Sequence, residues 1–428
     1  MRRYGSGWQR GLCKGAATFA GLFFRAVRRS FAFKITLLTL AWLLLAIACE
    51  QVHPGRFWPV LFGALTVPGA LVATALLALY WLRRNWRVAL LPAAALALAW
   101  PHVQRGFALH ASPLNEESGM KNEELGSRVG TADAPIPHSS FLIPHSRNEV
   151  SVLSANVRIF NVYAQLRDPD NASSTGFIRW LAESPADVLC LQDYYNEPRG
   201  SRQDGDVFRA TDRLGGPGSG RRAFVSTTLT NGIGAQFGMA IFSRFAIVRR
   251  GVVPFGRLSQ NHVMWADLVR PAARTGRGRP DTIRVFNLHL QSMSMAEADL
   301  EAATTTRAGL RAQGPNLLRR FRNGALVRAT QIDTVLARVA RSPYPVLLAG
   351  DLNDVPYSYT YDQLADRLQN AWATAGLGFG FTHRGKLPGL RIDNQFAGPE
   401  WRVRAVRVHR EIVWSDHFPL EALYELRR

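Results

Sequence analysis

Hydrophobic positions divide this chain into an apolar N-terminal part and a longer part of mixed pattern. Within the first 104 residues, the stretches Ile35–Cys49, Phe57–Leu82 and Val88–Gln104 contain no Asp, Glu, Lys or Arg. A helix that crosses a bilayer needs about 20 apolar residues. The pattern therefore predicts about three transmembrane helices over residues 35–104. The alternative is a hydrophobic hairpin inside a soluble domain, but Ala-Leu runs of this length rarely fit a globular core.

From Glu149 to Arg428 the pattern changes to short apolar runs that alternate with amphipathic stretches. The apolar runs predict buried strands, and a 3.6-residue period predicts helices at Phe177–Glu183 and Leu326–Val339. About 280 residues are enough to bury one large core. Such alternation is typical of an α/β or α+β fold. The predicted strands are Val152–Ala155, Val188–Leu191, Met239–Phe242, Val263–Leu268, Ile283–Leu290 and Val346–Ala349.

Polar side chains follow the ends of these predicted strands. The run Leu347–Pro356 reads LLAGDLNDVP, so a strand delivers Asp351 and Asn353 to its C-terminal end. Carboxylate and carboxamide oxygens are hard ligands that Mg²⁺, Mn²⁺ or Ca²⁺ prefers. The same residues are also common in plain turns, so this run alone favours neither interpretation. Further patterns of this kind are Asn156, Gln192-Asp193, His289, Arg391-Ile392-Asp393 and Ser415-Asp416-His417.

Taken together and in this order, these patterns resemble the endonuclease/exonuclease/phosphatase superfamily of metal-dependent phosphodiesterases and phosphomonoesterases. The resemblance extends from Glu149 to the C-terminus. It implies a DNase I-like, four-layer α/β sandwich, in which two packed β-sheets are flanked by helices. It also implies Mg²⁺ or Mn²⁺ as the cofactor and a phosphate ester, either nucleic acid or a phospholipid headgroup, as the substrate. The layout, with transmembrane helices before this domain, resembles membrane-anchored members found in bacteria.

The resemblance further implies a role for each residue at a matching position. Asp351 and Asn353 of the GDLND run would polarise the attacking water and hold the scissile phosphate. A carboxylate–imidazole dyad would face the negative charge that develops on the phosphoryl group. By this correspondence the catalytic residues are Asp351, Asn353, His417, His289 and Asp393, the substrate-binding residues are Asn156, Asn353 and His289, and the metal ligands are Asp193, Asn156 and Asp416.

One residue departs from the pattern of the superfamily. Asp193 stands where the principal metal carboxylate is usually a glutamate, and aspartate is one methylene shorter. The ion is therefore expected to sit differently or to bind more weakly. Other polar residues near the motifs are interpreted as structural, namely Gln192, Ser292, Tyr357 and Tyr361.

The formal charge of +20 is carried mainly by arginine, because the chain contains only four lysines. A basic surface attracts either a nucleic-acid backbone or an anionic lipid surface. An arginine bias, with abundant Ala and Gly, is equally typical of a GC-rich genome. Two basic segments stand out, Gly200–Arg222 and Arg307–Arg328. The three cysteines lie too far apart for a disulfide framework or a metal site.

Basic residues also predict the orientation in the membrane. Eight Lys or Arg residues precede the first hydrophobic stretch, three lie between the second and third, and only Arg56 lies between the first and second. The positive-inside rule then places the N-terminus in the cytoplasm of a bacterial cell and, with three spans of the inner membrane, the C-terminal domain outside it. If the third stretch lies only at the interface, this orientation reverses.

The expected organisation has four parts. Residues 1–34 form a basic cytoplasmic N-terminus, 35–104 the membrane anchor, 105–148 a flexible linker and 149–428 the catalytic domain. His138 and His145 belong to the linker and are interpreted as ordinary linker residues. The predicted function is a membrane-anchored, divalent-metal-dependent phosphoester hydrolase, and no protein partner is evident. The alternative is a catalytically silent, membrane-tethered binding or scaffold module of the same fold.

Overall fold

The computed structural model describes residues 30–110 and 141–427. Short segments within the second range lie outside the description, namely residues 145, 147, 164–165, 167, 169–170, 202–203, 257–260, 271–280, 293–306 and 386–388. The basic N-terminus before Ser30 and most of the expected linker, with His138 and His145, also lie outside the described residues. The described chain forms two compact units. One comprises the chain up to Cys49 with Phe62–Val103, and the other comprises Glu50–Leu61 with Gln104–Arg428.

The first unit is built of apolar helices. Helix α2 (Phe31–Gln51) packs against α4 (Val67–Arg84), and the indole of Trp81 donates a hydrogen bond of 2.8 Å to the hydroxyl of Thr36. Helix α5 (Trp86–Leu98) follows α4 across a turn at Asn85 and packs beside it. Many large apolar side chains on these helices are exposed, among them Leu38, Leu44, Leu76, Leu90 and Leu98. An exposed apolar surface of this kind is typical of a surface that contacts a membrane or another protein.

The helices of this unit match the three predicted spans only in part. Among the described residues, α2 alone is long and apolar enough to cross a membrane. The stretch expected to form the second span is divided into α3 (Val60–Leu65) and α4. The stretch expected to form the third is divided into α5 and α6 (Trp100–Gly106), which are bent by 63° and together are long enough for a second crossing. Pro68 at the start of α4 explains the first break, because proline lacks the N–H that a continuous helix needs.

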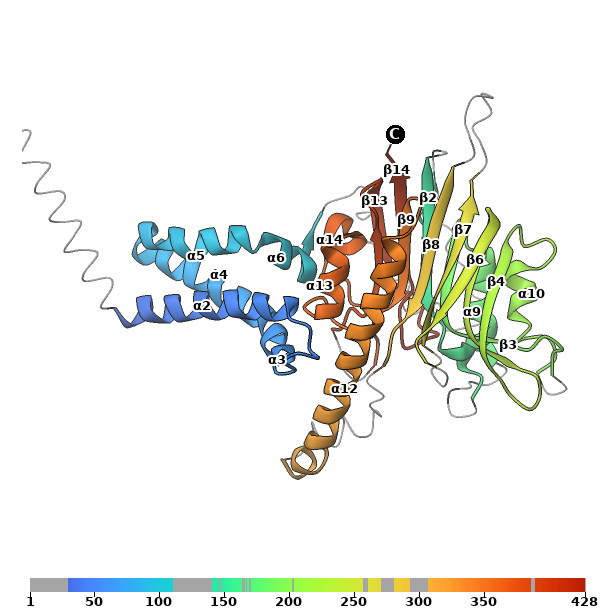
Figure 1. Cartoon of the computed structure of the whole chain (residues 1–428), viewed down its shortest axis with the longest axis horizontal. Coiled ribbons are helices and arrows are strands. Elements are labelled where there is room, and N and C mark those ends of the chain that lie inside the picture. The colour runs from blue at the N-terminus through green and yellow to red at the C-terminus, as the bar shows by residue number, and fades with distance from the viewer. Residues whose placement is uncertain are drawn as a thin grey trace, which may run out of the picture. The chain divides into compact units, whose positions relative to one another are not determined.

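The second unit contains two six-stranded mixed sheets (Figure 1). In each sheet the two central strands are parallel and the other neighbours are antiparallel. In spatial order the first sheet consists of β13 (Trp401–Val408), β14 (Leu420–Leu426), β2 (Glu149–Asn156), β3 (Val188–Asn196), β5 (Gln236–Ser243) and β4 (Arg222–Thr230). The second consists of β10 (Gln369–Asn370), β12 (Asp393–Ala397), β9 (Val346–Asp351), β8 (Thr282–His289), β7 (His262–Val269) and β6 (Ala246–Pro254).

Three hydrophobic clusters hold four layers together. The largest lies between the sheets and joins residues such as Val152 and Ile241 of the first sheet to Val285 and Leu347 of the second. A second cluster covers the outer face of the first sheet with α9 (Ala172–Glu183) and α10 (Ala210–Gly215). A third covers the outer face of the second sheet with α12 (Arg307–Val339) and α13 (Tyr359–Ala365). Figure 1 shows these helices on opposite outer faces. The predicted four-layer α/β sandwich is confirmed.

All six predicted strands are present, and the expected linker begins with regular structure. Ala108–Leu109 forms β1, which pairs antiparallel with β11 (Leu377–Gly378). At the other end of the expected linker, Phe141 and Leu142 are buried in hydrophobic clusters of the second unit. Helix α12 also begins earlier than the predicted Leu326, because its first half carries no apolar stripe that a periodicity could detect.

Gly350 allows the central strands of the second sheet to approach each other closely. It pairs with Leu288 of β8 in the parallel register and has φ +147°. A Cβ added at this position would lie 1.9 Å from the carbonyl oxygen of Leu288. Only glycine fits such a position without moving a strand.

We therefore predict that Gly350→Ala destabilises the protein by about 3 kcal/mol or more, because it adds both a backbone clash and an unfavourable φ. The measurement is the thermal unfolding of the full chain in detergent. Gly232→Ala is the matched control, since a Cβ there meets nothing within 4 Å. Equal midpoints for the two variants would contradict this account of Gly350.

Candidate active site

Strand register brings three predicted site residues and one further histidine into one row across the second sheet. His262 of β7 pairs with His289 of β8, which pairs with Asp351 of β9, which in turn pairs with Asp393 of β12. Each of the four is the first or last residue of its strand, so they lie together where these strands begin or end, and all are buried. The hydrogen-bond ladder of the sheet therefore fixes the spacing of this row.

The first sheet contributes residues to the same place. Asn156 ends β2, and its side-chain amide donates a hydrogen bond of 3.1 Å to the carboxylate of Asp351. The hydroxyl of Ser415 donates to the main-chain carbonyl of Asn156 and lies 3.3 Å from the carboxylate of Asp416. The sheets thus meet at Asp351, which Asn156, Asn353, His289 and His417 contact directly.

His417 and Asp393 form a hydrogen-bonded pair. Nδ1 of His417 lies 2.8 Å from Oδ2 of Asp393, and Nε2 lies 4.0 Å from Oδ2 of Asp351. Burial disfavours the charged imidazolium, but the two carboxylates outweigh burial and raise the pKa of His417 to about 10. The hydroxyl of Thr382 accepts hydrogen bonds from the main-chain N–H groups of Ile392 and Asp393 and so holds the dyad carboxylate in place.

His289 lies between two carboxylates. Its Nδ1 is 3.5 Å from Oδ1 of Asp193, and its Nε2 is 3.6 Å from Oδ2 of Asp351. Burial and then the neighbouring charge of Asp393 raise the pKa of Asp351 to about 6, against the opposing effect of the two histidines. Asp351 therefore titrates near neutral pH, which suits a group that exchanges protons with a substrate.

Two residues of the site have strained backbones. Asp193 has φ +46° at a bulge in β3, and Asn353 has φ +50° after β9. Asp and Asn tolerate this left-handed region better than most residues, and bulges redirect side chains beside active sites. The main-chain N–H of Asn353 donates to Asp351 at 2.7 Å, and its side-chain amide donates to the carbonyl of Leu290 at 2.9 Å. These bonds hold the strained turn.

Asp416 lies at the rim of this group. Its carboxylate is partly exposed and lies 3.3 Å from Nε of Arg158. Arg158 begins a run of four residues with positive φ that extends to Asn161 and is separated from Asn156 by Val157. This arginine was not among the residues expected in the site, and neither were His262 and His383, whose ring packs 5.1 Å from that of His417. A lone arginine or histidine in a sequence gives no signal of such placement.

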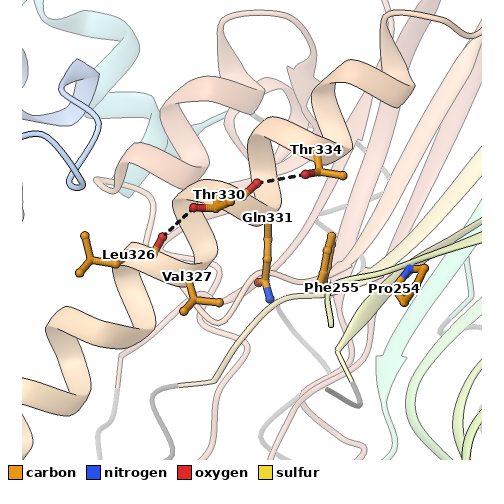
Figure 2. A pocket seen from close by; sticks show the side chains of 7 residues that line it. All are labelled: Pro254, Phe255, Leu326, Val327, Thr330, Gln331 and Thr334. Atoms are coloured by element: carbon orange, nitrogen blue, oxygen red, sulfur yellow. Dashed lines mark hydrogen bonds between the residues drawn. The ribbon is translucent and has the colours of Figure 1, made fainter. Parts of the chain in front are cut away.

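A pocket beside α12 is separate from these residues. It has a volume of about 490 Å³ and is lined by Leu326, Val327, Thr330, Gln331 and Thr334 of α12 together with Pro254 and Phe255 (Figure 2). The two threonine hydroxyls donate to carbonyls one turn earlier in the helix. The side-chain oxygen of Gln331 accepts from the main chain of Gln291 at 2.9 Å. The two hydroxyls and the amide oxygen that line this pocket are thus used within the fold.

The model of the Endonuclease/Exonuclease/phosphatase family matches residues 154–417. The chain belongs to this family. The match contains every predicted site residue, since the first is Asn156 and the last is His417. Residues 28–106 match a separate domain model of unknown function.

Solved structures of similar fold share little sequence with this chain. A family member from Beutenbergia cavernae is 20% identical, with a TM-score of 0.45, over 65% of this chain and 72% of that one. The catalytic domain of human Nocturnin with bound sulfate is 14% identical, with a TM-score of 0.45, over 68% and 100%. ANGEL2, a 2′,3′-cyclic phosphatase, is 16% identical, with a TM-score of 0.43, over 65% and 96%. No curated protein matches this chain.

Carboxylate and imidazole groups that could hold the divalent cation implied by the family gather at this site. Ligand atoms of Asp351, Asp393 and His417 all lie within 4.8 Å of one another. Oδ1 of Asp393 is buried and has no hydrogen-bond partner among the described residues, so one carboxylate oxygen of the cluster lacks a donor. Because His417 already bonds Asp393, the pair is better suited to a dyad than to metal ligation. Asp193, Asn156 and Asp416 remain the predicted metal ligands.

We predict that the pKa of His417 depends on Asp393. In the Asp393→Asn variant it should fall by about two units, because a neutral amide no longer favours the imidazolium. The pKa of the folded state, about 10, lies above that of an unfolded histidine, about 6.5. The pair therefore stabilises the fold fully below about pH 6.5 and loses this contribution as pH rises through about 10.

The measurement is a histidine NMR titration of the full chain, together with its unfolding midpoint as a function of pH. Asp333→Asn is the control, because Asp333 lies 3.7 Å from the remote His53. A His417 titration that is the same in Asp393→Asn and in the wild type would show that the dyad does not set this pKa.

Proposed function

We propose that this chain is a membrane-anchored, divalent-metal-dependent phosphoester hydrolase. The observation that carries the proposal is the buried carboxylate of Asp351 at the junction of the two sheets, within reach of Asn156, His289 and His417. A buried carboxylate beside two imidazoles is costly for stability and is typical of a site used for catalysis. Members of this family are phosphoester hydrolases, which agrees with this chemistry.

In this proposal each residue has a separate role in phosphoester cleavage. Asp351 orients the attacking water and accepts its proton, because its pKa of about 6 leaves it mostly ionised at neutral pH. Asn353 binds a phosphoryl oxygen. His417, kept protonated by Asp393, faces the charge that develops on the phosphoryl group and supplies a proton to the leaving oxygen.

A cation held by Asp193, Asn156 and Asp416 would supply positive charge beside the phosphate. His289 lies between Asp193, a proposed cation ligand, and Asp351, the proposed acceptor of the water proton, and so is close to both groups. Arg158 lies at the rim, where its Nε is 3.3 Å from Asp416. Its guanidinium is a group that binds phosphate oxygens well. These groups recognise the phosphate ester itself, which nucleic acids and phospholipid headgroups share.

Chain connectivity favours an odd number of crossings, and we infer three, one by α2 and two by the segment that returns to the catalytic unit. The chain leaves the catalytic unit after Leu61 and rejoins it at Gln104. A segment that returns to the same compact unit crosses a membrane an even number of times, so both ends lie on one side. The turn at Asn85 carries Arg83, Arg84 and Arg87, and the positive-inside rule assigns it to the cytoplasm. The catalytic unit then lies outside the bacterial inner membrane, and α2 is the first crossing.

We predict metal-dependent hydrolysis of bis-p-nitrophenyl phosphate by the full chain in detergent, in the presence of Mg²⁺ or Mn²⁺. Asp351→Asn should lower kcat/KM by about 1,000-fold, because it removes the proton acceptor. Asp212→Asn is the matched control, since Asp212 pairs with Arg209 on the surface. Plasmid DNA and a panel of sphingomyelin and phosphatidylinositol phosphates then distinguish a nuclease from a lipid phosphoesterase.

Activity that survives removal of the metal by chelation, or that survives Asp351→Asn, would contradict the proposed mechanism. A folded chain that binds metal and hydrolyses none of these substrates would favour the alternative function, a silent scaffold module.

The anchor proposal makes a prediction of its own. Alkaline phosphatase fused after Gln104 should be active, because this enzyme folds only outside the cytoplasm, and a fusion after Asn85 should be inactive. Enzyme activity in intact bacterial cells measures both. The opposite result for the two fusions would place the catalytic unit in the cytoplasm.

A further inference from the structure

The segment that returns from the hydrophobic helices is built into the catalytic unit. A Cβ at Gly106 would lie 2.1 Å from the hydroxyl of Tyr357, so the segment around Gly106 contacts that side chain closely. The ring of Phe107 packs edge-on against that of Phe379 at 4.9 Å. The next two residues form β1, which pairs with β11. A flexible tether would make none of these contacts.

Arg105 lies at the start of this segment and bridges two buried carboxylates. Its Nη1 is 2.7 Å from Oε2 of Glu50 and 2.7 Å from Oδ1 of Asp362. Glu50 is the penultimate residue of α2, and Asp362 lies in α13. Arg105 is 8% exposed, Asp362 2% and Glu50 0%. Charges buried this deeply persist only when they are paired, so the three residues hold the two anchor segments and α13 in one arrangement.

The same segment contacts the strand that carries the dyad. The guanidinium of the buried Arg391 donates to the main-chain carbonyl of Arg105 and, at 3.3 Å, to that of Phe379. Arg391 precedes Asp393 by two residues. The carbonyl of the intervening Ile392 accepts a hydrogen bond of 2.9 Å from the N–H of Leu352, the residue after Asp351. A short series of contacts thus runs from Arg105 to both catalytic carboxylates.

Arg391 is buried, and its guanidinium donates to main-chain carbonyls. One of these carbonyls is that of Arg105, and its position depends on the contacts that the side chain of Arg105 makes with Glu50 and Asp362. The side chain of Arg105 therefore determines where the main-chain acceptor of Arg391 lies.

We propose that Arg105 is a positioning residue for the catalytic site, through which the two segments that flank Phe62–Val103 hold Asp393 and Asp351 in place. This inference rests on the proposed phosphoester hydrolase function. It implies that the catalytic unit comprises Glu50–Leu61 and Gln104–Leu109 as well as residues 149–428. A catalytic domain cut off from its anchor then loses part of what orders its active site.

The test compares variants of the full chain in detergent. The triple variant Glu50→Gln, Arg105→Met, Asp362→Asn changes all three residues of the bridge together, so none of the three is left as a buried ion without its partner. Arg105→Lys keeps a cation between the two carboxylates. The control is Arg284→Met with Asp267→Asn, which removes an equally buried ion pair of 2.6 Å elsewhere in the second sheet.

For the triple variant we expect kcat to fall about 10- to 100-fold at unchanged KM, because the catalytic carboxylates shift while the phosphate contacts stay. Arg105→Lys should retain most of kcat, and the control should retain all of it. Amide hydrogen exchange of the full chain should become faster in peptides that contain Leu352 and residues 391–393, and not in the rest of the sandwich.

Hydrogen exchange also separates failure of this inference from failure of the proposed function. If the wild type hydrolyses no phosphoester, the proposed function fails, and exchange at residues 391–393 alone decides whether Arg105 positions this strand. A folded triple variant with wild-type kcat and wild-type exchange at these residues would overturn the inference. Faster exchange spread evenly over the whole unit would overturn it as well, since it would indicate a general loss of stability.

Discussion

The burial of one carboxylate, that of Asp351, determines how this fold is assembled. Asp351 is 1% exposed, and its hydrogen-bond donors come from both sheets, the side chain of Asn156 from one and the turn at Asn353 from the other. A carboxylate without such donors would be expensive to remove from water. The two sheets therefore have to meet with β2 and β9 in one relative position, and this position brings the remaining site residues together.

The parallel pairing of β8 and β9 extends this constraint along the sheet. His289 and Asp351 are register partners, and Gly350 lets the strands approach at the preceding position. A shift of the register by one residue would turn His289 to the other face of the sheet. The same pairing that builds the apolar core thus fixes the distance between a histidine and a carboxylate, with no loop involved.

The sequence could predict the strands and the order of the site residues, because both depend on local patterns. An apolar run followed by Asn156, Asp193 or Asp351 is visible in a single line of sequence. Arg105 and Arg158 gave no such signal, since their partners lie 257 and 258 residues away in Asp362 and Asp416. A buried charge cannot be told from an exposed one until its partner is known. For the same reason the expected linker concealed β1, whose two residues form a strand only because β11 lies beside them.

Asp193 stands where the resemblance to the superfamily implies a glutamate, and the backbone at this position offers a local physical explanation. The residue lies at a bulge of β3 with φ +46°, a conformation that aspartate adopts more readily than longer side chains do, because its carboxylate can bond nearby main-chain groups. At this bulge the shorter side chain already reaches to 3.5 Å from His289. A glutamate would extend the carboxylate by one methylene from the same backbone and displace it relative to His289. The bulge therefore favours aspartate at this position, and the shorter side chain is not by itself a sign that the site has lost its function.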